Sequence, residues 1–349
     1  MAEPKRSDGT LYAQRQKLPW PKDEPFRILS IDGGGIRGIL PAALLKEMET
    51  RYTAGVPAGK FFDMIAGTST GGIIALGLGA GLSAQSIFEF YVEHGPTIFP
   101  RRRFTLQPFR KLQSWAWAAR DTVRYRYDAK ALAEALGSVF GDAVLGSAER
   151  RLVVPAFDQA TEVWLFKTPH HPDYKLDWKE PLTLVARATS AAPSYFRSMK
   201  DGKRRFLDGG VWANNPVMLA LVDALACYDI DRRQIEILSL GCADNKYVIT
   251  RRHDSGGLWR WKGIMSASSQ LQSQNALGQA GLLIGRDQLL RVDAPADKTE
   301  QIDLDDFESA FAVLPGMAIS LLEQHRDGLQ KFFQVERPVF SAYHGERAR

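Results

Sequence analysis

A serine stands between two glycines in the pentapeptide GTSTG, which is centred on Ser69. The pentapeptide follows residues 61–67, a short apolar run that predicts a buried strand, and precedes residues 70–80, which predict a helix. A sharp strand-to-helix turn leaves little room beside the serine, so Gly67 and Gly71 must stay small. The turn also places the hydroxyl at a helix N-terminus, where developing negative charge is favoured. We predict that Ser69 is a nucleophile; the alternative is an idle serine in a glycine-rich turn.

Three consecutive glycines, Gly33, Gly34 and Gly35, follow the first predicted strand, residues 26–32. Consecutive glycines allow backbone N–H groups to approach an anion closely. An acyl-transfer enzyme needs such donors for the oxyanion of its tetrahedral intermediate. We therefore predict an oxyanion hole at these glycines, with Arg37 either supporting the loop or contacting a phosphate.

The same loop also fits the dinucleotide-binding pattern G-x-G-x-x-G through Gly33, Gly35 and Gly38. That pattern calls for an acidic residue at the end of the second strand, about 20 residues further on. Here the second predicted strand ends at Gly67, and its acid, Asp63, lies near its start. The Walker A pattern fails too, because no Gly-Lys-Ser/Thr follows the loop. Nucleotide binding at this loop is the less favoured alternative.

An aspartate, Asp208, ends the predicted strand 205–208 and is followed by Gly209 and Gly210. A carboxylate at a strand end is positioned to project into a site. The signal is weak when taken alone, because aspartate followed by glycine is also common in turns. Asp208 therefore becomes a candidate site residue only in combination with the two glycine motifs.

Strand and helix patterns alternate along the chain, which favours an α/β fold with a central, mostly parallel sheet sandwiched by helices. Residues 1–25 are expected to form an N-terminal arm, and residues 26–349 a catalytic domain. Within that domain, residues 26–241 form the expected core and residues 242–349 a helical C-terminal extension. Strands are predicted over 26–32, 61–67, 151–157, 163–167, 205–208, 235–241 and 288–293, and helices over 39–52, 70–80, 84–94, 129–140, 182–191, 217–228 and 266–283.

The composition is that of a globular protein: of 349 residues, 45% are hydrophobic and 24% charged, so a large core needs no covalent staples. Its two cysteines, Cys227 and Cys242, have no metal-ligand spacing, so we predict buried thiols, a reducing compartment and no metal or cofactor. Residues 1–25 lack the apolar segment of a signal peptide, and no run reaches the roughly 18 apolar residues of a membrane span. We therefore expect a cytoplasmic protein.

The motifs, in this order, resemble the patatin-like phospholipase family. The family pattern comprises a Gly-Gly-Gly-x-Arg-Gly loop, then Gly-x-Ser-x-Gly, then Asp-Gly-Gly. Two further blocks agree: residues 188–196 (ATSAAPSYF) resemble the segment before the family's aspartate, and residues 214–216 (NNP) resemble the segment after it. The resemblance covers residues 26–241 and implies the patatin variant of the α/β-hydrolase architecture.

The resemblance implies a Ser–Asp dyad without histidine. Ser69 would attack an ester carbonyl, and Asp208 would accept the serine proton and later activate water. Backbone amides of the glycine loop would form the oxyanion hole. The residues themselves leave a triad open, because the order Ser, Asp, His would admit His253 or His325.

A lipid ester substrate follows from the resemblance, with membrane phospholipid as the leading choice and lysophospholipid or galactolipid as alternatives. The enzyme would then associate peripherally with the inner membrane. Some bacterial members are antiphage effectors that a cyclic nucleotide activates, so such an activator is also expected. The alternative function is a catalytically silent binding or assembly module, and a homo-oligomer stays open. The net charge of +5 is modest, and no nucleic-acid substrate is expected.

Residues 99–127 form an insert in which basic and aromatic side chains alternate. One hypothesis is a lid or membrane-docking surface, in which Arg101, Arg102 and Arg103 meet lipid phosphates while tryptophans lie at the interface. A second is an anion pocket for a regulatory nucleotide. The third alternative is a solvated basic loop with a few core aromatic residues.

Overall fold

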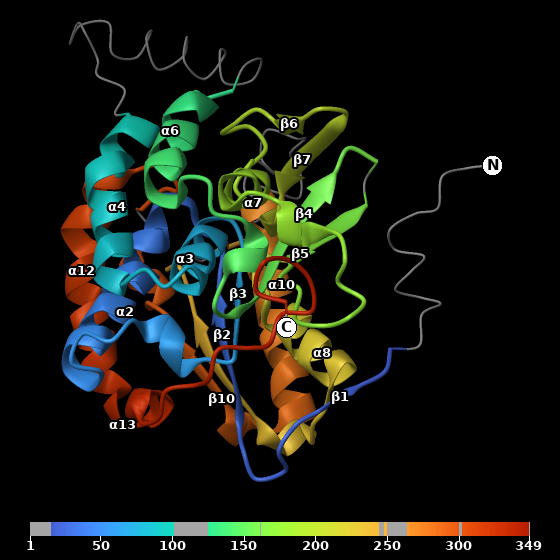
Figure 1. The fold of residues 1–349 in the computed structure, drawn as a ribbon. Helices are drawn as coiled ribbons and strands as arrows, with labels where there is room; N and C mark the ends of the chain where they lie inside the picture. Colours follow the sequence, from blue (N-terminus) through green and yellow to red (C-terminus); the bar gives the residue numbers. More distant parts are fainter. Residues whose placement is uncertain are drawn as a thin grey trace, which may run out of the picture.

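A layered α/β structure surrounds one large sheet (Figure 1). The computed structural model describes residues 15–100, 125–160, 162–243, 248–249, 264–299 and 302–348. The strands lie in the order β10-β9-β2-β3-β4-β7-β6, and β5 pairs with β4. Their bounds are β2 Phe26–Ile31, β3 Met64–Gly67, β4 Arg151–Asp158, β5 Val163–Lys167, β6 Met199–Asp201, β7 Arg204–Asp208, β9 Ile235–Leu240 and β10 Leu289–Val292.

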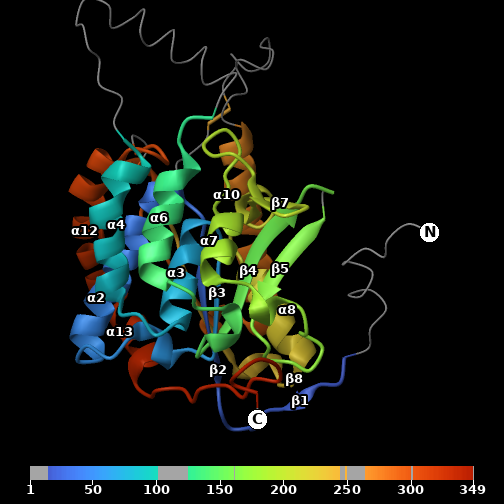
Figure 2. The ribbon, with the colours of Figure 1, turned by 45° about the horizontal axis from the view of Figure 1, so that its top comes forward.

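Helices cover both faces of the sheet (Figures 1 and 2). Residues of α2, α3, α4, α6, α7 and α12 share one apolar core, and residues of α8 and α10 share the other. Successive residues of β2 alternate between the two cores, since Ile28 packs with α8 and Leu29 with α2. The bounds are α2 Ile39–Tyr52, α3 Thr70–Gly79, α4 Ala84–Ile98, α6 Ala129–Phe140, α7 Leu182–Thr189, α8 Val217–Cys227, α10 Ile264–Ile284, α11 Ala296–Thr299, α12 Phe307–Gln324 and α13 Arg326–Gln330.

The predicted fold class is confirmed: β10, β9, β2, β3 and β4 are parallel neighbours, while β5, β7 and β6 join antiparallel. The predicted strand 61–67 begins too early, because Ala58–Phe61 forms a 3-10 turn and only Met64–Gly67 pairs with β2. Residues 1–14 of the expected N-terminal arm lie outside the described residues, and Leu18–Pro19 (β1) pairs with Tyr228–Asp229 (β8). No helix in the described ranges combines the length and apolar character needed to cross a bilayer.

One long strand, β4, holds β3 and β7 along the same edge. Val153 pairs with both β3 and β5, so these two strands lie on opposite edges of β4. Ala156 pairs with both β5 and β7, so β7 lies on the edge that β3 occupies. Because β7 runs antiparallel, its last residue, Asp208, lies next to the carboxyl end of β3. The sheet therefore brings the end of β7 to the turn that leaves β3.

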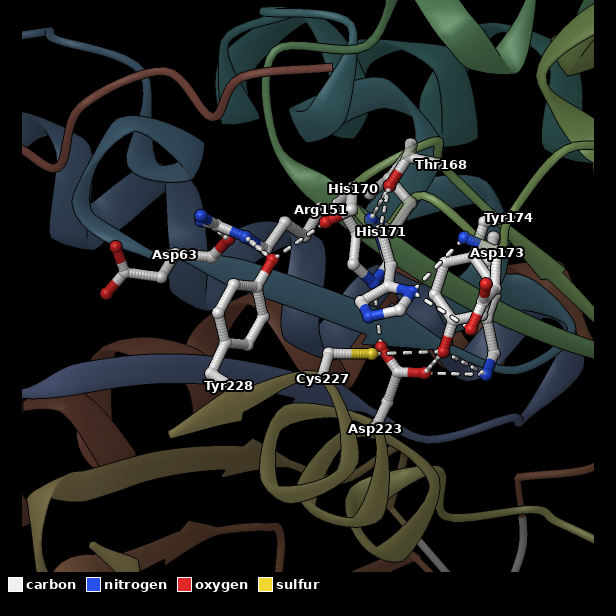
Figure 3. A network of polar contacts seen from close by, with 12 residues as sticks. Asp63, Arg151, Thr168, His170, His171, Asp173, Tyr174, Asp223, Cys227 and Tyr228 are labelled. Carbon is white, nitrogen blue, oxygen red and sulfur yellow. Dashed lines mark hydrogen bonds and ion pairs between the residues drawn. The ribbon is translucent and has the colours of Figure 1, made fainter. Parts of the chain in front are cut away.

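A buried polar network joins β5, the following loop and α8 (Figure 3). Asp223 accepts hydrogen bonds from Lys167 Nζ at 2.5 Å, from the Tyr174 hydroxyl at 2.5 Å and from His170 Nε2 at 2.7 Å. The Thr168 hydroxyl donates to His170 Nδ1 at 2.8 Å, so a neutral ring protonated at Nε2 satisfies both contacts. Burial accordingly lowers the pKa of His170. Burial alone would raise the pKa of Asp223, but Lys167 and His170 hold it well below its usual range.

The Asp223→Asn variant should lower the free energy of unfolding by about 3–5 kcal/mol, because it leaves the nearly buried Lys167 ammonium without its counter-ion. Urea denaturation at pH 7 measures this change. Glu134→Gln is the matched control, since its partner in the exposed pair Lys130–Glu134 stays hydrated and about 0.5 kcal/mol is expected. Equal losses in the two variants would contradict the assigned role of Asp223.

Candidate active site

Ser69 and Asp208 are in direct contact. The Ser69 hydroxyl donates to Asp208 Oδ2 at 2.7 Å, and the Gly210 amide donates to Asp208 Oδ1 at 2.7 Å. Both side chains are buried. The Asp208 amide also donates to the Ala191 carbonyl at 3.1 Å, which fixes the end of β7. A serine whose proton points at a positioned carboxylate is the arrangement that base-assisted nucleophilic attack requires.

The turn between β3 and α3 is strained at the serine. Ser69 has φ of +54° and ψ of −120°, a conformation that costs a non-glycine residue about 1–3 kcal/mol. The flanking glycines permit the turn, because a Cβ on Gly67 would lie 2.0 Å from the Gly71 carbonyl oxygen. Thr189 Oγ1 accepts the Ser69 amide at 3.0 Å and donates to the Pro155 carbonyl at 2.6 Å. The threonine therefore attaches the elbow to β4.

The Asp208 carboxylate has an unusually high proton affinity. Burial raises its pKa to about 6, although the hydrogen bonds from Ser69 and the Gly210 amide act in the opposite direction. A base with a pKa close to working pH is ionised when needed and still accepts a proton readily. A pKa of about 6 is therefore consistent with the predicted role of Asp208 as a base.

The glycine loop lies beside the dyad, and its amides have different partners. The Gly33 amide already donates to the Asn214 carbonyl at 3.0 Å. The loop turns at Gly35, whose φ is +57°, and the next amide, that of Ile36, donates to the Leu304 carbonyl at 2.9 Å. Of the three predicted donors, Gly34 and Gly35 are therefore better placed than Gly33 to serve an oxyanion.

Arg37 is hydrogen-bonded to the glycine loop and to the residues that follow β9. It is buried, and its guanidinium donates to the Ala243 carbonyl, beyond the end of β9, at 2.7 Å. Its amide donates to the Gly34 carbonyl at 3.1 Å. Although Arg37 also borders the cavity beside Ser69 and Asp208, these contacts are with backbone carbonyls, so of the two predicted roles they favour loop support.

A cavity of about 540 Å³ opens onto the dyad. Its lining includes Ser69, Asp208 and the glycine loop, and is apolar over most of its surface. Its apolar lining includes Ile73, Phe90, Ile98, Phe99, Leu132 and Phe196. A cavity with this polarity suits an ester whose reacting carbonyl is attached to a long apolar chain.

Neither Ser69 nor Asp208 hydrogen-bonds a histidine within the described part of the chain. His325 caps the C-terminus of α12, and the cavity lining does not include it. His253 lies outside the described residues. The contacts therefore favour the predicted dyad over a triad that uses His325.

Arg101, Arg102 and Arg103 also lie outside the described residues, so the predictions for residues 101–124 stay predictions. Sequence reasoning missed the roles of Thr189 and Asn214, although both lie in blocks that carry the family resemblance. Thr189 holds the elbow, and Asn214 holds Gly33. For Thr189 the available signal was a polar side chain within such a block, whereas Asn214 acts through its backbone carbonyl, which its residue type does not reveal.

His170, Asp223 and Cys227 bring three metal-ligand atom types within 4.8 Å of one another. The chemistry of this cluster does not suit a cation. Lys167 already neutralises Asp223, and burial raises the pKa of the Cys227 thiol to about 12. A thiol must lose its proton to bind a metal, so we assign the cluster to structure.

An activated serine at a strand-to-helix elbow of an α/β sheet defines the class of serine acyl hydrolases. Comparison with known proteins narrows this class. The family model described as patatin-like phospholipase matches residues 29–221. The chain belongs to the patatin-like phospholipase family.

Three bacterial relatives are each named cGAMP-activated phospholipase. The Pseudomonas aeruginosa relative is 37% identical over 197 residues, which cover 56% of each chain. The Escherichia coli relative is 33% identical over 242 residues, or 65% of each chain. The Vibrio cholerae relative is 33% identical over 260 residues, or 67% of this chain and 70% of the relative. The chain thus spans less than two thirds of the length of the first two relatives.

The rate of ester hydrolysis should depend on the ionisation of Asp208. Because the base must be unprotonated, kcat/KM for a soluble p-nitrophenyl ester should rise tenfold per pH unit at low pH and level off near pH 6. A pH profile of the wild-type protein measures this. A midpoint near the ordinary aspartate pKa of about 4 would contradict a buried base.

Gly71→Ala should lower the free energy of unfolding by about 1–3 kcal/mol, because the added Cβ would lie 2.3 Å from the Ile31 carbonyl oxygen. Gly137→Ala is the matched control. Gly137 lies in α6 with nothing within 4 Å of its added Cβ, and alanine there should raise stability by about 1 kcal/mol. Urea denaturation compares the two, and a tolerated Gly71→Ala would refute the steric account of the elbow.

Proposed function

We propose that this protein hydrolyses acyl esters of membrane phospholipids through a covalent acyl-Ser69 intermediate. The observation that carries the proposal is the 2.7 Å hydrogen bond from the Ser69 hydroxyl to Asp208 in the lining of a largely apolar cavity. Family membership supports the lipid substrate. The alternative is a silent binding module, but such a module needs neither a strained serine nor a buried base beside it.

The first half of the reaction transfers the acyl group to the enzyme. Ser69 Oγ attacks the ester carbonyl while Asp208 takes the hydroxyl proton. The Gly34 and Gly35 amides stabilise the oxyanion, a contribution of about 100-fold or more per donor. As the intermediate collapses, the C–O bond of the ester breaks, and Asp208 returns the proton to the departing lysophospholipid alcohol.

The second half releases the fatty acid. Asp208 removes a proton from water, and the hydroxide attacks the acyl-Ser69 carbonyl. The bond to Ser69 Oγ breaks, the fatty acid leaves, and the proton returns to the serine. Neither half needs a metal or a cofactor, since the dyad performs every proton transfer.

A cyclic nucleotide is the proposed activator, and the cytoplasmic face of the inner membrane is the proposed place of action. Support comes from the three relatives, each of which is named a cGAMP-activated phospholipase. Activation of this kind would make the protein the effector of a nucleotide signal. Low hydrolysis without the nucleotide would then be its resting behaviour.

Fatty acid release from phosphatidylethanolamine–phosphatidylglycerol vesicles tests the proposal, with and without cyclic GMP–AMP. Ser69→Ala and Asp208→Asn should each reduce release at least about a thousandfold, because each removes one partner of the dyad. Ser138→Ala and Asp142→Asn are matched controls. Ser138 is exposed on α6 and Asp142 is exposed just after it, so both variants should keep wild-type activity.

Two outcomes would overturn the proposal. Substantial release by either dyad variant would show that the hydrolysis does not use Ser69 and Asp208. No release by folded wild-type protein under any condition would favour the silent module. Release that does not depend on the nucleotide would support the phospholipase activity but contradict the proposed activation by a cyclic nucleotide.

A further inference from the structure

A second cavity, of about 590 Å³, adjoins the active-site cavity. It lies where α6, α7 and β7 meet, elements that are neighbours in both ribbon views (Figures 1 and 2). The two cavities share Leu132, Ser190 and Phe196, so a single wall separates them. Nothing in the proposed chemistry of the dyad uses this second cavity.

The lining of the second cavity is strongly basic. Among the described residues that line it, five carry a positive charge and Asp128 is the only acid. Asp128 is engaged, because its Oδ1 accepts the Lys130 amide at 3.0 Å as the cap of α6. The basic residues are Lys130, Arg187, Arg197, Lys200 and Arg205. A cavity with such an excess of positive charge attracts anions and repels cations.

Most of these cations have no carboxylate partner in the described part of the chain. Arg205 contacts the Ser198 hydroxyl at 3.1 Å, and Arg197 lies over the Tyr125 ring. Lys130 alone pairs with an acid, Glu134. Arg204, the neighbour of Arg205 on β7, forms ion pairs with the nearby acids Glu180 and Asp201. Arg187, Arg197, Lys200 and Arg205 therefore have no ion pair among the described residues and can contact an anionic ligand.

The wall between the cavities carries the supports of the dyad. Ser190, which borders both cavities, directly follows Thr189, whose Oγ1 accepts a hydrogen bond from the Ser69 amide. The next residue is Ala191, whose carbonyl accepts the Asp208 amide. Arg187 and Arg205 stand two and three residues from Thr189 and Asp208 respectively. A ligand bound to both arginines would therefore hold the two chain segments that position the nucleophile and the base.

We propose that this second cavity is a phosphodiester-binding site whose occupant braces the wall of the catalytic cavity. A phosphodiester fits because guanidinium groups recognise phosphate oxygens through paired, charge-assisted hydrogen bonds. Phospholipid headgroups and cyclic dinucleotides both contain this group. Binding stands independently of catalysis, whereas the effect on hydrolysis rests on the proposed phospholipase function.

Isothermal titration calorimetry on the full chain carrying Ser69→Ala tests the binding without turnover. The probes are cyclic GMP–AMP and glycerophosphoglycerol, with glycerol as the uncharged control. The test variant adds Arg187→Gln and Lys200→Gln. The matched control adds Arg232→Gln and Arg233→Gln, two exposed arginines just before β9, at the amino end of the parallel strands. Thermal melting shows whether each variant is folded.

At least one phosphodiester should bind the parent protein, and its Kd should rise about tenfold or more in the test variant but stay unchanged in the control. Binding should also weaken with added salt. Preference for cyclic GMP–AMP identifies a soluble nucleotide as the source, and equal or tighter binding of glycerophosphoglycerol identifies a lipid headgroup. If the test variant does not fold, the single substitution Lys200→Gln, at an exposed position, must still weaken binding.

Binding of neither probe at millimolar concentration, or binding that the test variant leaves intact, would overturn the proposal. Fatty acid release separates this failure from failure of the phospholipase. For this assay, Arg187→Gln and Lys200→Gln are introduced into the protein that retains Ser69. They should lower the fatty acid release that the phosphodiester stimulates. The rate of p-nitrophenyl ester hydrolysis without ligand should stay within about twofold of the wild-type rate, because the dyad itself is unaltered. Loss of both activities in a folded variant would instead make Arg187 and Lys200 ordinary structural residues.

Discussion

The contact between Ser69 and Asp208 depends on how β4 shares one of its edges. β3 pairs with the first part of this edge and β7 with the last part. One strand runs parallel to β4 and the other antiparallel, so their carboxyl ends approach each other. The elbow after β3 and the aspartate that ends β7 therefore meet, although 139 residues of sequence separate them. The other parts of the site are arranged around this meeting point.

The site is held in a costly state. Ser69 adopts a backbone conformation that few non-glycine residues adopt, and Asp208 is a carboxylate in a buried place. The raised pKa of Asp208 means that its protonated form favours the folded state, and that this contribution is lost as pH rises through about 6. Thr189, the Gly210 amide and the apolar cores on both faces of the sheet supply the compensating contacts.

Much of the fold was predictable because local pattern and tertiary role agree. The buried run 26–31 and the helices 39–52 and 129–140 follow from apolar spacing and, for the last, from the Asp128 cap. The start of β3 was misplaced because Phe61 and Phe62 are as apolar as a strand, yet they pack within and after a turn. Apolar character reports burial and does not by itself distinguish a strand from a buried turn.

The candidate site could be predicted from the sequence only where its residues belong to recognisable motifs. Ser69, Asp208 and the glycine loop have distinctive neighbours in sequence, whereas the partner of the Gly33 amide is a backbone carbonyl that no residue type announces. The basic cavity was unpredictable for a related reason. Its cations come from α6, α7 and the segment 197–205, and only the packing of these elements brings them together.

The hydrogen bond from the Gly33 amide to the Asn214 carbonyl joins two parts of the site that perform different tasks. Gly33 begins the glycine loop, the proposed oxyanion hole, and Asn214 follows the turn that starts at Asp208. A shift of either segment would act on the other through this single hydrogen bond. The proposed oxyanion loop and the segment that carries the proposed base are therefore mechanically coupled, and a distortion of one segment is transmitted to the other.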